Sequence, residues 1–341
     1  MNLSSVRSDV GPRTEESPVT VIKCGLSGAE PSVKKLRISI VEYLNTAPLV
    51  WGFTDGPLAG KYDLSFTVPS QCAEALRRGD VDIAIIPSIE YQRIDDLVAL
   101  PDMAIAAKRE VRSLLVVSKR PIDMAKRIAL DTSSRSTAAL VRILAKEHWG
   151  IQPEFVDAAP DPAEMLKIAD AALVIGDPAL RISLKMEALT QKTPGGGDCC
   201  EGDPDEMPIP GFETLFVYDM THQWREMTRK PAVLAIWAAP AHVVDERVAA
   251  DFLASKKFGV ERIREIGEAA SIKLDLPPRA LERYLTENIN FDLDAENLAG
   301  LQLFFEKAAG NGLIPCARPM EFAGSGDRGT AFGQSTRAAR S

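Results

Sequence analysis

The sequence predicts a two-lobed α/β protein with a ligand cleft between its lobes, and three observations support this prediction. From residue 36 onward, short apolar runs rich in β-branched residues alternate with helical segments, which is typical of parallel βαβ units. Two long apolar runs, 112–119 and 231–240, suit a pair of strands that pass between lobes. A chain of 341 residues is long enough for about two domains.

The first unit opens with LRISIV, 36–41, whose apolar character predicts a buried parallel strand. Pro48 lies near the start of a short helical stretch, 47–53, where its fixed φ and missing N–H do no harm. YDLSFTV, 62–68, is expected to form the next strand. The helix that follows, 69–80, has proline at its start and glycine near its end.

Asn45 and Thr46 fall in the turn between the first strand and its helix. Open α/β sheets bind their ligands at this carboxyl edge. The Asn45 amide and the N–H groups at the start of the helix suit a polar or anionic small molecule. The alternative interpretation is that both residues only cap the helix.

A second strand is expected at VDIAIIP, 81–87, and it leads into Ser88 and a short helix at 89–92. Ser88 therefore places another small polar residue at the end of a strand. MAIAA, 103–107, and RSLLVVSK, 112–119, are expected to follow as further strands.

The segment TSSRST lies between an expected strand at 127–131 and an expected helix at 138–150. Hydroxyl donors, free backbone N–H groups and the helix dipole at such a position all favour a bound anion. Its residues are Thr132, Ser133, Ser134, Arg135, Ser136 and Thr137. The alternative is N-capping by a hydroxyl group, with the arginine in solvent.

Further strands are expected at 152–158 and 171–177, and Asp177 begins a helix at 178–184. Asp177 either faces the cleft or caps that helix, and the cap is the simpler interpretation. The pattern resumes with a strand at 213–219, a helix at 221–228 and the strand at 231–240. Apolar residues three and four positions apart then predict amphipathic helices at 243–256, 260–272, 278–287 and 295–310.

The segment 190–212 breaks the alternation, because glycine, proline and acidic residues dominate it. It is expected to form a long surface loop. Cys199 and Cys200 lie within it beside several acidic residues. Adjacent cysteines cannot easily both bind one zinc ion, and no Cys-x-x-Cys motif or pair of histidines is close, so no metal site is expected.

These elements predict a discontinuous first lobe, 36–116 with 239–322, and a second lobe, 117–238. The polar ends, 1–35 and 323–341, are expected to be disordered. In this arrangement the polar groups of Asn45, Ser88, Ser113 and residues 132–137 line one cleft, where a two-lobed protein normally binds its ligand.

Composition limits the classes of function. A net charge of −8 disfavours general binding to nucleic acid or anionic lipid. No run is long enough to span a bilayer, and the N-terminus lacks the apolar core of a secretory signal, so a cytoplasmic protein is expected. The five cysteines are an odd number and mostly scattered, which fits reduced thiols.

The usual catalytic and nucleotide-binding motifs are absent from the sequence. His148, His222 and His242 have no spacing that indicates a metal site or a nucleophile–base pair. No Gly-x-Gly-x-x-Gly or Gly-Lys-Ser/Thr phosphate loop is present. On these motifs a small-molecule binding protein is the leading interpretation, and an enzyme would work by positioning and hydrogen bonding.

Five separated motifs resemble the chorismate dehydratase family of the futalosine route to menaquinone. They are YLNTAPL (43–49), RRGDVDIAIIPSIEY (77–91), VRSLLVVSK (111–119), DTSSRSTAALVRILA (131–145) and AALVIGDPAL (171–180). The resemblance runs in order over roughly 36–320. Two departures are the absence of an aromatic residue at 232 or 233 and a longer 190–212 loop.

The resemblance implies the fold of type II periplasmic binding proteins, no cofactor and no metal, and the conversion of chorismate to 3-[(1-carboxyvinyl)oxy]benzoate and water. It implies catalytic roles for Asn45 and Ser113, the first orienting substrate or leaving hydroxyl. It also implies that the 132–137 segment binds a carboxylate, with Thr46, Ser88 and Asp177 as further contacts. The substrate's own enolpyruvyl carboxylate is expected to take the proton.

Two other functions stay open at this point. A non-catalytic solute-binding protein would use the same cleft, although exported binding proteins carry a signal sequence. The ligand-sensing domain of a transcription factor is disfavoured, because the chain shows no DNA-binding module and is acidic. The expected partner is therefore a small-molecule substrate, with neither nucleic acid nor a membrane involved.

Overall fold

A computed structural model describes residues 35–192, 199–201, 209–212 and 214–324. The two ends, 1–35 and 323–341, were expected to be disordered. Apart from residues 35, 323 and 324, they lie outside the part that the structure describes. Most of the predicted 190–212 loop also lies outside it.

The first sheet has five strands in the order β2-β1-β3-β11-β4. Their bounds are β1 Arg37–Val41, β2 Asp63–Thr67, β3 Ile83–Pro87, β4 Leu97–Ala107 and β11 Ala232–Pro240. β1 is parallel to both β2 and β3, which confirms the βαβ prediction for this part. β11 is antiparallel to β3 and β4, so a strand from late in the sequence lies inside this sheet.

The second sheet has six strands in the order β7-β6-β8-β5-β10-β9. Their bounds are β5 Leu114–Ser118, β6 Arg127–Asp131, β7 Glu154–Ala158, β8 Ala171–Ile175, β9 Cys199–Glu201 and β10 Thr214–Asp219. β6 is parallel to β7 and β8, whereas β5 is antiparallel to β8 and β10. The prediction of one loop at 190–212 was wrong in part, because β9 pairs with β10 there.

Helices connect the strands within each sheet. The first sheet carries η1 Leu44–Thr46, α1 Ala47–Thr54, α2 Pro69–Arg78 and η2 Ser88–Gln92. The second sheet carries η3 Ile122–Met124, α3 Arg135–Glu147, α4 Pro162–Ile168, α5 Gly176–Lys192 and α6 Met220–Thr228. The sequence patterns missed α4 and predicted too short a helix for α5.

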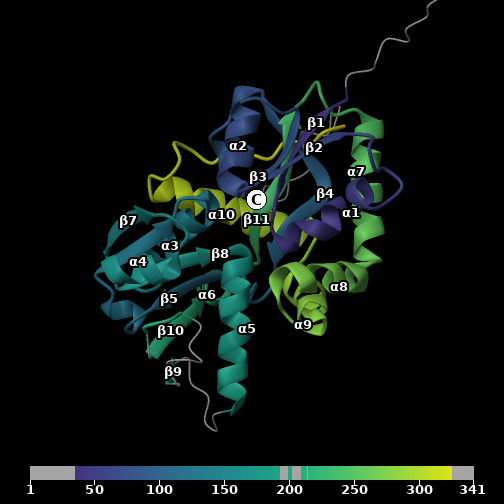
Figure 1. The fold of residues 1–341 in the computed structure, drawn as a ribbon. Helices are drawn as coiled ribbons and strands as arrows, with labels where there is room; N and C mark the ends of the chain where they lie inside the picture. Colours follow the sequence, from purple (N-terminus) through teal and green to yellow (C-terminus); the bar gives the residue numbers. More distant parts are fainter. Residues whose placement is uncertain (1–34, 193–198, 202–208, 213, 325–341) are drawn as a thin grey trace, which may run out of the picture. The chain divides into compact units, whose positions relative to one another are not determined.

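The four predicted C-terminal helices are present. They are α7 Glu246–Val260, α8 Ile263–Leu274, α9 Pro278–Arg283 with the π-helical turn η4 Tyr284–Asn288, and α10 Ala295–Gly310. Figure 1 shows α7 and α1 side by side next to the first sheet, with α8 and α9 beyond them. A large apolar core includes strands of both sheets, and a smaller cluster packs α4 and α5 on the second sheet.

Helix α1, which follows η1, is packed closely against α7. The hydroxyl of Ser255 in α7 donates to the Leu49 carbonyl at 2.9 Å. Gly259 lies so near α1 that a Cβ atom there would be 2.1 Å from the Pro48 carbonyl oxygen. This close approach holds the η1–α1 segment on the first sheet.

Gly259→Ala is therefore expected to lower the free energy of unfolding by about 2 kcal/mol, as overpacking of a tight interface does. Alanine's better helix propensity opposes this by about 1 kcal/mol. Gly310→Ala is the matched control, because a Cβ atom there would meet nothing within 4 Å. Urea unfolding of both variants checks the prediction, and a Gly259→Ala protein as stable as Gly310→Ala would contradict it.

Candidate functional site

The predicted site residues lie where strands of the two sheets end. Asn45 and Thr46 form part of η1 after β1, and Ser88 opens η2 after β3. In the second sheet, residues 132–137 follow β6, and Asp177 lies in the first turn of α5 after β8. Ser113 immediately precedes β5, whose first residue pairs with the last residue of β8.

Several contacts join these strand ends across the two sheets. The Ser88 and Ser136 hydroxyl oxygens are 3.2 Å apart, and the Ile89 backbone N–H donates to Ser136 Oγ at 3.1 Å. The Ser70 N–H at the start of α2 donates to the Ser133 carbonyl at 3.1 Å. The structure therefore brings Ser88 together with the hydroxyl-rich segment.

Helix capping was the alternative interpretation for Asn45 and Thr46, for the 132–137 segment and for Asp177. Thr46 and Ser134 occupy the N-cap positions of α1 and α3, and neither side chain makes a capping hydrogen bond. Thr46 Oγ1 lies 3.4 Å from Asn45 Oδ1, and Asp177 Oδ1 accepts from the Leu44 N–H at 3.0 Å. Asp177 thus connects α5 of the second sheet to η1 of the first, and burial raises its pKa.

Asn45 and Ser113 meet at a tyrosine that the sequence patterns did not single out. The Tyr284 hydroxyl donates to Ser113 Oγ at 2.8 Å, and the Asn45 side chain lies near enough to influence the pKa of the same phenol. All three side chains are buried. No local signal marked Tyr284, because it falls in an ordinary amphipathic helical pattern far along the chain.

A strained backbone places Ser113. Arg112 has φ of +64°, a conformation that is uncommon for residues other than glycine. The half-buried Asp219 carboxylate accepts from the Arg112 N–H at 2.6 Å, and the Ser113 carbonyl accepts from the Gly176 N–H at 2.8 Å. Burial raises the pKa of Asp219. Such strain persists only where the surroundings hold it, which is frequent at functional sites.

Ser133 is oriented by the protein itself. Its backbone N–H and its hydroxyl both donate to Asp131 Oδ1, at 2.8 and 2.6 Å. Tyr43 lies near Ser133, and burial raises the pKa of this tyrosine to about 12. Gly176, at φ of +66°, packs against the ring, because a Cβ atom there would be 2.7 Å from Tyr43.

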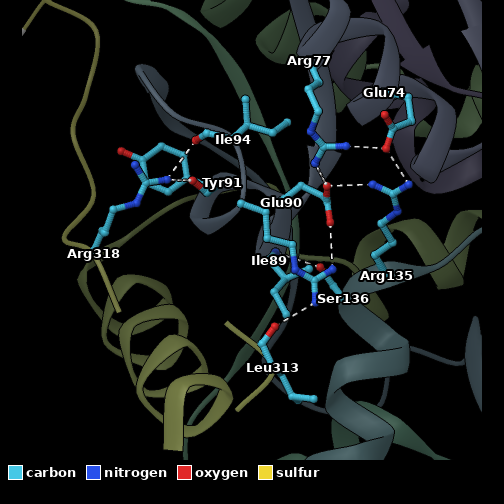
Figure 2. Close-up of polar contacts among 11 residues, drawn as sticks. Glu74, Arg77, Ile89, Glu90, Tyr91, Ile94, Arg135, Ser136, Leu313 and Arg318 are labelled. Atoms are coloured by element: carbon cyan, nitrogen blue, oxygen red, sulfur yellow. Dashed lines mark hydrogen bonds and ion pairs between the residues drawn. The ribbon is translucent and has the colours of Figure 1, made fainter. Parts of the chain in front are cut away.

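Arg135 reaches across to the first sheet, as Figure 2 shows. Its guanidinium group pairs with Glu90 at 2.8 Å and with Glu74 at 2.7 Å. The Glu90 carboxylate is fully buried and also pairs with Arg77 at 2.6 Å and Arg93 at 3.0 Å. The observed partners of Arg135 are thus carboxylates of the protein, and its contact with a substrate stays a prediction.

Each half of the predicted site borders a cavity. One, of about 410 Å³, is lined by η1, α1 and α8 and includes Tyr43, Thr46 and Asp177. Another, of about 260 Å³, lies at the start of α3 and includes Thr132 and Ser134. Ala232 and Val233, where the resemblance led us to expect an aromatic residue, lie beside Ser136 and Thr137.

The described residues show neither a metal-binding cluster nor a membrane-spanning helix. Among them, no three His, Cys, Asp or Glu side chains gather as a metal site would require. The side chains of Cys199 and Cys200 lie outside that part. None of the helices that the structure describes is both long and apolar enough to cross a membrane.

Comparison with known families identifies a match over most of the chain. A family model described as menaquinone biosynthesis matches residues 36–310. A chorismate dehydratase from Thermus thermophilus is 28% identical over 271 residues, which cover 79% of this chain and 93% of that protein.

Solved structures with a similar fold include periplasmic and transport-related binding proteins. A protein from Archaeoglobus fulgidus has a TM-score of 0.62 at 17% identity, covering 82% of this chain and 98% of that one. The periplasmic aliphatic sulphonate binding protein from Escherichia coli has a TM-score of 0.53 at 17% identity, covering 84% and 95%. The ligand-binding component of a Staphylococcus aureus ABC-type import system has a TM-score of 0.56 at 13% identity, covering 85% and 96%. These likenesses confirm the predicted two-lobed, periplasmic-binding-protein-like fold.

Proposed function

This chain belongs to the menaquinone biosynthesis family, and from that premise we propose that it is a chorismate dehydratase, a carbon–oxygen lyase acting in the cytoplasm. It would convert chorismate to 3-[(1-carboxyvinyl)oxy]benzoate and water. The observation that carries the proposal is the meeting of Asn45 and Ser113, from separate sheets, at the strand ends that also hold the 132–137 segment.

The reaction needs charge stabilisation more than a strong base. The proton leaves ring carbon 3 and the hydroxyl leaves ring carbon 4, so together they form water. Carbon 3 is conjugated through a ring double bond to the ring carboxylate, and removal of its proton gives an enolate-like dianion. Hydrogen-bond donors that bind this growing charge more tightly than the ground state lower the barrier.

The site residues are assigned roles on this basis. Asn45 would orient the substrate or the leaving hydroxyl, and Ser113 would donate a hydrogen bond to the substrate. The start of α3, whose first-turn N–H groups and hydroxyls favour an anion, would bind one of the two carboxylates. The enolpyruvyl carboxylate of the substrate would take the proton, so the protein need not supply the base.

The test is to mix the purified protein with chorismate and no added cofactor. Loss of the cyclohexadiene absorbance, with an aromatic product lighter by one water, is the expected result. Stabilisation by chorismate without turnover would instead indicate a solute-binding protein that uses the same cleft. Neither turnover nor binding would overturn the proposed substrate.

A further inference from the structure

We propose that Tyr284 is a positioning residue for this reaction, lying beside Asn45 and Ser113 and directing the Ser113 hydrogen toward the substrate. The inference deepens the proposed function and rests on it. No motif that predicted the function includes Tyr284, so it is an addition to the site that only the fold brings there.

The geometry around the phenol is the first support. Tyr284 is only 2% exposed, and its hydroxyl donates to the equally buried Ser113 Oγ at 2.8 Å. The Asn45 side chain lies near enough to influence the pKa of the same phenol. One phenol thus lies near both the turn after β1 and the residue that precedes β5.

The direction of these hydrogen bonds decides what Ser113 can do. A phenol has a single hydrogen, and Tyr284 gives it to Ser113, whose oxygen acts as the acceptor. The hydrogen of Ser113 must then point elsewhere, and no acceptor takes it in the part of the chain that the structure describes. A buried donor of this kind calls for a partner, and a carboxylate or hydroxyl of the substrate can supply it.

Tyr284 is also suited to remain a neutral donor. A tyrosine is already protonated at neutral pH, and burial raises the pKa of Tyr284 further above its ordinary value. Hydrogen bonds in series polarise one another, so donation from Tyr284 makes the Ser113 hydroxyl a stronger donor.

The local backbone supports the same assignment. Tyr284 begins the π-helical turn η4, and π-helical turns are frequent at functional sites. Asn288, at the end of this turn, donates from Nδ2 to the Glu110 carbonyl at 3.0 Å. The turn is therefore anchored to the segment that leads into Ser113. This contact holds the Tyr284 hydroxyl beside the Ser113 hydroxyl.

The experiment compares Tyr284→Phe, Ser113→Ala and the double variant with chorismate as substrate. Tyr284→Phe removes one oxygen atom and keeps the ring, so we expect kcat to fall about tenfold to a hundredfold with KM changed by less than about threefold. The kcat of the double variant should be less than about twofold below that of Ser113→Ala alone, because Tyr284 acts through Ser113.

Tyr62→Phe is the matched control, since Tyr62 is also buried and donates its hydroxyl hydrogen to Asp251 of α7. It should lose comparable thermal stability while keeping wild-type kcat. Full activity of Tyr284→Phe, or additive losses of kcat in the double variant, would overturn the positioning role of Tyr284. In either case, turnover by the wild type would leave the proposed function intact. A wild type without turnover would overturn both.

Discussion

Asn45→Ala is expected to lower kcat for chorismate about a hundredfold to a thousandfold, the loss seen when one preorganised donor is removed from a charge-stabilising site. Asn45 lies in the short turn after β1, near the Tyr284 phenol that donates to Ser113. Its truncation would remove a polar contact to the substrate and also the amide beside this phenol. Steady-state kinetics with chorismate measures the effect.

The effect on folding should be much smaller, because a carboxamide in a turn contributes little apolar burial. Gln92→Ala is a suitable control: Gln92 is also a buried carboxamide in a turn after a parallel strand of the same sheet. Among the described residues its amide bonds to the Arg318 backbone, accepting at 2.7 Å and donating at 2.8 Å. If both variants lost melting temperature and activity in equal proportion, the catalytic assignment of Asn45 would be wrong.

Glu90→Ala is expected to lower the free energy of unfolding by about 3 kcal/mol, as breaking a buried ion pair does. The carboxylate is fully buried and holds Arg77, Arg93 and Arg135 together (Figure 2). Its removal leaves three guanidinium groups without their shared counter-charge. Their side chains are 29–35% exposed and can reach water, which places the loss at the lower end of the usual range.

The control is Glu74→Ala, because Glu74 pairs with two of the same arginines, Arg77 and Arg135. Its side chain is 34% exposed, and an exposed pair contributes less than about 1 kcal/mol. Urea unfolding of both variants measures the difference. Equal losses in the free energy of unfolding for the two variants would contradict the prediction that the buried Glu90 contributes more than the exposed Glu74.

Residue patterns within the sequence predicted most of the fold. The parallel strands β1 to β3 and β6 to β8 were predicted because the spacing of apolar residues along the chain indicates strands and helices. The short α4 and the pairing of β9 were not predicted, since a seven-residue helix and a three-residue strand are too short for periodicity to decide. The division into lobes, 36–116 with 239–322 and 117–238, stays a prediction.

The sequence by itself determined most of the elements, the strand-end positions of Asn45, Ser88, Asp177 and the 132–137 segment, and the family motifs. Only the tertiary structure decided the partners of these residues. Tyr284 meets Ser113 across 171 residues, and Arg135 meets Glu90 across 45. The physical reason is that periodicity and capping arise between neighbours in the chain, whereas a hydrogen bond or an ion pair depends on distances that only the packing of the two sheets sets.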